Sequence, residues 1–305
     1  MLKNGDVLCC LGDSITAGGV WMAEVYQTVG AKKDIKCFNC GVSGGTANGA
    51  TNYLHGFCLG RNPDKVTVMF GINDICRWVF SVNYKEDNAL EVVRSAIKRY
   101  AEKTEYLVKS IIEYGAEPIL CTPPPYDEYN ERAEENLRCD SYMAECAEIV
   151  KALGEKYGCK VVDFRTPMLN MMTAKQPISP DRVHPNADGY HIMAQIFLYE
   201  MGEIEACDFD TPFALEEWNA ARREVEKQIK WLDYVDYNAM LGKHISEGWG
   251  VPEKIVACRE RYETFENKET YVPSCYKFYI ENSARREDLE SELVKLTVYP
   301  RRINK

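Results

Sequence analysis

The sequence predicts an α/β protein with a five-stranded parallel sheet that helices cover on both faces. Five short apolar runs end in turn residues, as buried parallel strands do. Helical patterns separate most of these runs, so crossovers must join the strands and the strands must run parallel. The five runs are residues 7–11, 35–39, 66–70, 118–121 and 160–164.

Helices are expected where apolar residues recur three and four positions apart. Gly158 follows one such segment and is a suitable C-terminal stop, while Asn186 precedes another and is a suitable N-cap. The expected helices cover residues 21–29, 88–114, 134–157 and about 187–201.

The chain of 305 residues is long enough for one large α/β domain with an appendage. The alternating pattern ends near residue 205, which predicts a main domain over 1–205 and a C-terminal extension over 206–305. The extension is rich in aromatic residues, and Pro212 opens a segment with helical apolar spacing. Because no Gly/Ser-rich linker precedes it, we expect a mainly helical extension packed on the main domain.

Charge and composition exclude several kinds of partner. The formal net charge is −10 and the basic residues are scattered among acidic ones, so no nucleic-acid binding is expected. No apolar run approaches the roughly 18 residues of a membrane span, and no membrane association is expected. The first strand-like run starts at residue 7, which leaves no room for a signal peptide and predicts a cytoplasmic protein. Most of the 13 cysteines lie in apolar runs, as reduced, buried thiols do.

Polar residues and glycines follow the first two predicted strands at their carboxyl ends, where open parallel sheets bind ligands. Ser14 comes after the first strand, at the start of a helix whose first backbone N–H groups are free. A single serine at such a place is usually only a helix cap. The run 39–45 follows the second strand, and its glycines let the backbone aim N–H groups at a ligand. A tight turn is the alternative for the glycines alone.

The third and fifth strands are followed by an amide and by a histidine–carboxylate pair. Asn73 offers a neutral side-chain donor suited to a tetrahedral oxyanion, and Asp74 is expected to cap a turn. Asp181 lies three residues before His184, so it can bond Nδ1–H and leave Nε2 free to take a proton from Ser14. Alone, such a pair is more often a surface pair or part of a metal site. Together these residues supply the nucleophile, base, base-orienting acid and oxyanion donors of acyl transfer.

The four sites match in order the sequence blocks of the SGNH hydrolases, also called GDSL-type esterases and lipases. The chain resembles this family from residue 7 to about 201, through residues 12–14, 39–44, 71–74 and 181–184. The resemblance implies a three-layer, flavodoxin-like α/β/α sandwich and a triad of Ser14, His184 and Asp181. It also implies an oxyanion hole made by the N–H groups of Ser14 and Gly44 and the side chain of Asn73.

Competing functions lack part of their usual pattern. Cys37, Cys40, His55 and Cys58 have zinc-like spacing. However, Cys37 falls in a predicted strand and Cys40 in the glycine run, where a metal would compete with the oxyanion hole. We therefore expect no metal and no cofactor. Phosphoryl-transfer or dinucleotide chemistry would need a glycine motif after the first strand that is missing here. A non-catalytic binding module would normally lack Ser14 or His184.

The predicted function is that of a serine ester hydrolase acting on a small-molecule ester. A carbohydrate O-acetylesterase, working on acetylated oligosaccharides, competes with a lipase, lysophospholipase or thioesterase for longer chains. The first is favoured because the sequence has no evident membrane-binding helix. Asp13, Trp78 and Tyr126 are expected to contact the substrate, although Tyr126 and Trp78 could equally pack. Assembly into a homo-oligomer is left open.

Overall fold

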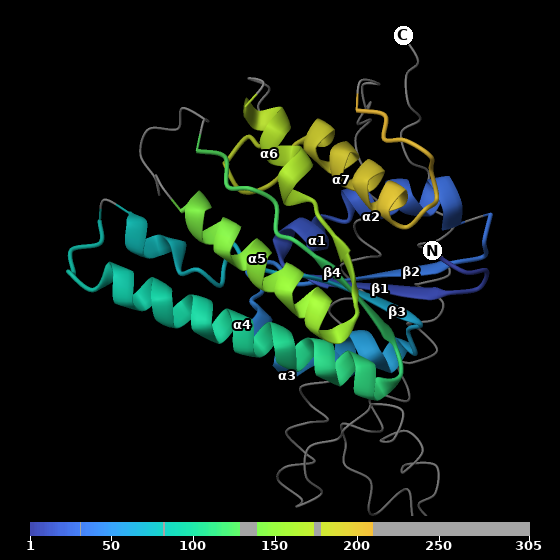
Figure 1. Ribbon diagram of the computed structural model, residues 1–305, viewed down its shortest axis with the longest axis horizontal. Coiled ribbons are helices and arrows are strands. Elements are labelled where there is room, and N and C mark those ends of the chain that lie inside the picture. The colour runs from blue at the N-terminus through green and yellow to red at the C-terminus, as the bar shows by residue number, and fades with distance from the viewer. Residues whose placement is uncertain (31, 82, 129–138, 174–177, 210–305) are drawn as a thin grey trace, which may run out of the picture. The chain divides into compact units, whose positions relative to one another are not determined.

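The computed structural model describes residues 1–30, 32–81, 83–128, 139–173 and 178–209 (Figure 1). The chain divides into two compact units, and the first contains Met1–Asn52 and Pro63–Ala214. Tyr53–Asn62 belongs to the second unit. The sequence predicts a mainly helical extension over 206–305 that packs on the main domain. These residues lie almost entirely outside the described ones, so both expectations stay predictions.

Five parallel strands form the sheet in the order β2-β1-β3-β4-β5, which is the flavodoxin-like arrangement. This confirms the predicted fold class, and each strand lies within about two residues of its predicted limits. The register pairs Gly12 with both Gly41 and Met69, so β2, β1 and β3 end at the same edge. The strands are β1 Val7–Gly12, β2 Lys36–Gly41, β3 Lys65–Met69, β4 Glu117–Cys121 and β5 Lys160–Val162.

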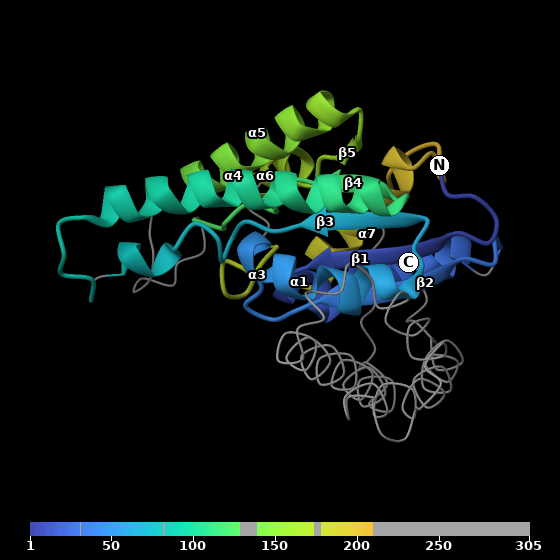
Figure 2. The same cartoon turned by 90° about the horizontal axis from the view of Figure 1, so that it is seen from below.

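Helices cover both faces of the sheet, with α4 and α5 on one face and α2 and α7 on the other (Figures 1 and 2). Asn186 caps α7 as predicted, because its side chain accepts the Gly189 N–H at 2.9 Å. The predicted helix over 21–29 is α2 followed by a π-helical turn, and α5 begins later than expected. The α-helices are α1 Ser14–Gly18, α2 Val20–Val25, α3 Ala47–Tyr53, α4 Ala89–Tyr114, α5 Asp140–Tyr157, α6 Arg165–Thr173 and α7 Ala187–Glu200. Short π and 3₁₀ turns are η1 Tyr26–Gly30, η2 Leu54–Cys58, η3 Leu59–Arg61 and η4 Arg77–Phe80.

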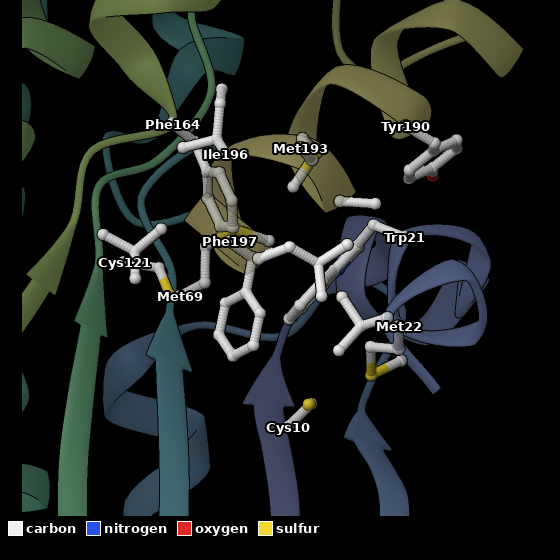
Figure 3. Close-up of a cluster of buried hydrophobic side chains, with 14 of the residues drawn as sticks. Cys10, Trp21, Met22, Met69, Cys121, Phe164, Tyr190, Met193, Ile196 and Phe197 are labelled. Carbon is white, nitrogen blue, oxygen red and sulfur yellow. The ribbon is translucent and has the colours of Figure 1, made fainter. Parts of the chain in front are cut away.

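The core between the sheet and the α2–α7 layer holds α2 in place (Figure 3). The Trp21 ring lies 5.7 Å from that of Phe164 and 5.2 Å from that of Phe197, and Trp21 is only 1% exposed. Large aromatic side chains contribute most to such cores. Because Gly19 joins α1 directly to α2, this packing also fixes the helix that begins with Ser14.

The structure tests the expected burial of the cysteines. The sequence predicts buried thiols where cysteines lie in apolar runs, and Cys9, Cys10, Cys121 and Cys146 are buried, while Cys76 is partly exposed. None of the helices within the described ranges combines the length and apolar character that crossing a membrane requires.

Candidate active site

Ser14 is the first residue of α1, directly after β1. Asp13 is the N-cap, and its side chain accepts the Ile15 N–H at 2.9 Å. The helix lies against the end of β2 so closely that a Cβ on Gly41 would come within 2.2 Å of the Ala17 nitrogen. Only glycine permits this approach, which fixes the nucleophile at the carboxyl edge of the sheet.

The structure brings Ser14, His184 and Asp181 into one hydrogen-bonded chain. The Ser14 Oγ lies 2.8 Å from His184 Nε2, and His184 Nδ1 lies 2.6 Å from Asp181 Oδ2. An ionised Asp181 accepts the Nδ1–H, which leaves Nε2 as the acceptor for the Ser14 hydroxyl. Ser14 and His184, 170 positions apart, thus come together in the geometry that a nucleophile and its base require.

Asp181 is held in its ionised form. Partial burial raises its pKa, but hydrogen bonds from the His184 ring and from the backbone N–H groups of His184 and Val183 outweigh this and lower the pKa to about 2. The two backbone bonds measure 2.7 and 3.0 Å. Asp181 therefore carries a negative charge throughout the neutral pH range, as an acid that stabilises an imidazolium must.

The turn that carries His184 is anchored by Arg182. This residue has a positive φ of 71°, a conformation that non-glycine residues adopt only where their surroundings hold them. Its backbone carbonyl accepts the Asp127 N–H at 3.0 Å, and its side chain hydrogen-bonds to Tyr126. Arg182 is only 3% exposed. Sequence reasoning missed this anchor, because a residue inside the Asp-x-x-His motif has no signature of its own.

Tyr126 is a packing residue, which corrects the expectation that it contacts the substrate. It is 2% exposed, so its ring offers no face to a sugar. Its backbone N–H donates to Asp140 Oδ1 at 2.8 Å. Arg165 donates to both oxygens of Asp140, at 2.8 and 2.6 Å, and thereby fixes the acceptor of the Tyr126 N–H.

Asp13 is also buried, which corrects its assignment to substrate binding. Its exposed fraction is 2%, and its carboxylate is directed at the Ile15 N–H within its own helix. Burial raises its pKa to about 6, although the Ile15 N–H and the nearby His184 act in the opposite direction. Asp13 therefore caps the helix that begins with Ser14.

Trp78 is the predicted substrate contact that the structure leaves accessible. It is 55% exposed and lies in the 3₁₀ turn η4, a few residues after Asn73. Its ring contacts Tyr84 edge-on, with a centroid distance of 5.3 Å. Contact between Trp78 and the substrate stays a prediction.

The predicted oxyanion donors lie on two loops that a hydrogen bond connects. Asn73 Nδ2 donates to the Gly45 carbonyl at 3.0 Å, which leaves its second N–H for another acceptor. Gly44 is exposed at a φ of 74°, and a Cβ there would meet nothing within 4 Å. The Ser14 N–H belongs to the first turn of α1, where helices have free donors.

The chain is similar in sequence and fold to known proteins. The family described as "GDSL-like Lipase/Acylhydrolase" matches residues 8–197. An acetylxylan esterase of Geobacillus stearothermophilus is 28% identical over 222 residues, which is 66% of this chain and 96% of that protein. The crystal structure of Axe2, an acetylxylan esterase from the same organism, has a TM-score of 0.56 at 25% identity and covers 67% of this chain and 99% of its own.

A further structure shows likeness of fold alone. LAE5, an alpha/beta hydrolase enzyme from the metagenome of Lake Arreo in Spain, has a TM-score of 0.55 at 22% identity. It covers 66% of this chain and 97% of its own. The segment that the family matches contains every residue of the site described above, from Asp13 to His184.

Proposed function

Because the chain belongs to the GDSL-like lipase/acylhydrolase family and is a carboxylic ester hydrolase, we propose that it removes acetyl groups from acetylated carbohydrates through a serine acyl-enzyme. The observation that carries this proposal is the chain of hydrogen bonds from Ser14 through His184 to Asp181, at 2.8 and 2.6 Å. Such a chain lets a hydroxyl act as a nucleophile at neutral pH.

The first half of the reaction transfers the acetyl group to the enzyme. His184 Nε2 takes the proton of Ser14 as Oγ attacks the ester carbonyl carbon. The resulting imidazolium, stabilised by Asp181, then gives this proton to the departing sugar oxygen, which leaves as a hydroxyl group. In the second half, His184 takes a proton from water as the water oxygen attacks the acetyl carbon. The imidazolium then returns that proton to Ser14 Oγ as its bond to the acetyl group breaks, which releases acetate and restores the free serine.

The tetrahedral intermediates place a negative charge on the former carbonyl oxygen. The N–H groups of Ser14 and Gly44 and the free N–H of Asn73 are the donors we propose for this oxygen. Such donors act mainly on the transition state, because charge develops on the oxygen only there.

Acetylated carbohydrate is proposed for three reasons. The chain is 28% identical to a protein named as an acetylxylan esterase. In addition, residues 122–127 after β4 are buried, and Tyr126 is bonded to Asp140, which Arg165 holds in turn, so this segment offers no groove for a long acyl chain. The exposed ring of Trp78 is suited to stack against a sugar.

A panel of p-nitrophenyl esters of increasing acyl length tests the acyl specificity. We expect kcat/KM for acetate to exceed that for octanoate by at least about tenfold, whereas a fitted groove would gain about 0.8 kcal/mol per methylene. Acetylated xylo-oligosaccharides then test the alcohol, with Ser14→Ala as the blank. An optimum at about eight carbons or more would favour the lipase, lysophospholipase or thioesterase alternative.

The role of Trp78 is tested by Trp78→Ala with Tyr199→Ala as the matched control, since Tyr199 is a 50% exposed aromatic residue at the end of α7. Loss of ring stacking should raise KM for acetylated oligosaccharides about 2- to 10-fold and leave p-nitrophenyl acetate unaffected. An equal effect on both substrates would argue against a sugar contact.

A cytoplasmic location is part of the same proposal. Among the described residues, the eleven cysteines are free thiols, and most are buried. Burial raises the pKa of the Cys121 and Cys146 thiols, which keeps them protonated and unreactive. Such a set of thiols suits a reducing compartment.

A further inference from the structure

Asp74 connects two loops at the edge of the sheet. Its Oδ1 accepts the backbone N–H of Ala47 at 2.9 Å, at the start of α3. The carboxyl group is buried, with Asp74 only 6% exposed. The sequence predicted that Asp74 caps a turn, and the structure shows that the side chain caps a helix 27 positions earlier in the chain.

The glycine loop between β2 and α3 is therefore held at both ends. At its start, the Val42 N–H donates to the Gly12 carbonyl at 2.9 Å. At its far end, Asn73 and Asp74 bond Gly45 and Ala47, at 3.0 and 2.9 Å. Gly44 lies between these anchors and is exposed, so the anchors rather than side-chain packing determine the direction of its N–H.

We infer that Asp74 is a positioning residue of the esterase, which acts through the Ala47 N–H to hold the Gly44 N–H in the oxyanion hole. This inference rests on the proposed function. It assigns Asp74 a role in the rate of the acyl step without contact between its carboxyl group and the substrate.

The surroundings of Asp74 determine its charge. Its Oδ2 is buried and has no hydrogen-bond partner within the described part of the chain. Burial raises the pKa of Asp74 to about 7, and the nearby Asp13 adds to this, while the bonds from Ala47 and Gly71 and the charge of Arg99 lower it. Tyr100 of α4 and Cys146 of α5 also face it, and both are uncharged near neutral pH.

A protonated Asp74 can anchor the loop without adding charge to the site. Its carbonyl oxygen still accepts the Ala47 N–H, and no negative charge then lies near the developing oxyanion. As the pH rises through about 7, Asp74 ionises and repels that oxyanion. We therefore expect the acyl step to slow in this range.

Two substitutions separate the anchor from the charge. Asp74→Ala removes the acceptor, so kcat on p-nitrophenyl acetate should fall about 10- to 100-fold while KM stays within about twofold. Asp74→Asn keeps an oxygen for the Ala47 N–H, so kcat should return to within about threefold of wild type. The decline in kcat above about pH 7 should disappear in this variant.

Asp6→Ala is the matched control. Asp6 is 7% exposed, and its Oδ2 accepts the Lys3 N–H at 2.7 Å just before the amino end of β1. This substitution removes a buried aspartate with a similar backbone bond at the opposite edge of the sheet and should leave kcat unchanged. Equal losses in Asp6→Ala and Asp74→Ala would overturn the inference.

Hydrogen exchange of the Ala47 amide, measured by NMR in the Ser14→Ala protein, tests the anchor without any substrate. Exchange should be at least about tenfold faster in Asp74→Ala and unchanged in Asp74→Asn. Unaltered exchange in Asp74→Ala, or failure of asparagine to restore kcat, would overturn the inference.

If the wild type hydrolyses no ester, the proposed function fails, and the exchange rates still decide whether Asp74 holds the loop. If Asp74→Ala does not fold, a wild-type pH profile in Asp74→Asn overturns the inference.

Discussion

An aspartate lies beside the catalytic group in each of two regions, the turn from β1 to α1 that carries Ser14 and the turn 181–184 that carries His184. Asp13 is buried and its side chain accepts the Ile15 N–H, and burial raises its pKa to about 6. The Asp181 side chain is 37% exposed, and it accepts bonds from the His184 ring and two backbone N–H groups that lower its pKa to about 2.

The surroundings of each acid, and not its closeness to the reacting groups, determine its charge. Several donors and partial exposure keep Asp181 ionised, which suits an acid that must stabilise an imidazolium. Burial makes the negative charge of Asp13, which caps α1, costly. The same substitution should therefore have different effects in the two regions.

The largest effect is expected from the catalytic pair itself. Ser14→Ala and His184→Ala should each lower turnover by about 10⁶, because nucleophile and base act as one unit. Turnover of p-nitrophenyl acetate measures this, and circular dichroism checks folding. If Ser14→Ala kept even about a tenth of the wild-type rate, Ser14 would not be the nucleophile.

A matched pair of substitutions tests the difference between the two acids. Asp181→Asn should lower kcat by about 10⁴, because an amide favours the wrong tautomer of His184. Asp13→Asn should change kcat by less than about tenfold, because asparagine is as good an N-cap as aspartate. Similar losses of kcat in the two variants would show that the acids have the same role.

A smaller effect is expected from Asn73, in the turn that follows β3. Asn73→Ala should lower kcat by about 10²–10³ with little change in KM, because its free N–H bonds an oxygen that becomes charged only in the transition state. Steady-state kinetics separate the two constants. A change confined to KM would show that Asn73 binds the substrate instead.

The smallest effect concerns stability, and its sign differs between the two acids. The pKa of Asp13 is about 6 in the fold against a usual 3.8, so the fold loses stability as the pH rises between these values. Asp13→Asn should therefore be more stable than wild type at pH 8 by about 1–3 kcal/mol, with no advantage below about pH 4.

Asp181 should behave in the opposite way. Its pKa is lowered to about 2, so its contribution is present above 3.8 and is lost as the pH falls through about 2. Asp181→Asn should cost at most about 1 kcal/mol at neutral pH, because the side chain is partly exposed. Urea unfolding at pH 8 and pH 4 measures both variants, and a stabilised Asp181→Asn at pH 8 would contradict the sign.

Features that local sequence patterns specify could be predicted before the structure was known. Apolar runs followed by turn residues determined the strands and their parallel order, because a strand buried on both faces needs such a run. The positions after these strands determined that Ser14, Asn73 and His184 meet at one edge, because the carboxyl ends of parallel strands lie together. The Asp-x-x-His spacing also determined the partner of His184, since three residues of a turn suffice to bring the two side chains together.

Features that depend on contacts between distant segments became evident from the folded structure. Asp74 caps α3 and Arg182 binds Tyr126 across the fold, and neither pairing has a pattern in the sequence. Packing of these segments also leaves Asp13 and Tyr126 with only 2% of their surface exposed. A pKa follows from desolvation and from the number of donors, and both arise only when remote parts of the chain pack together.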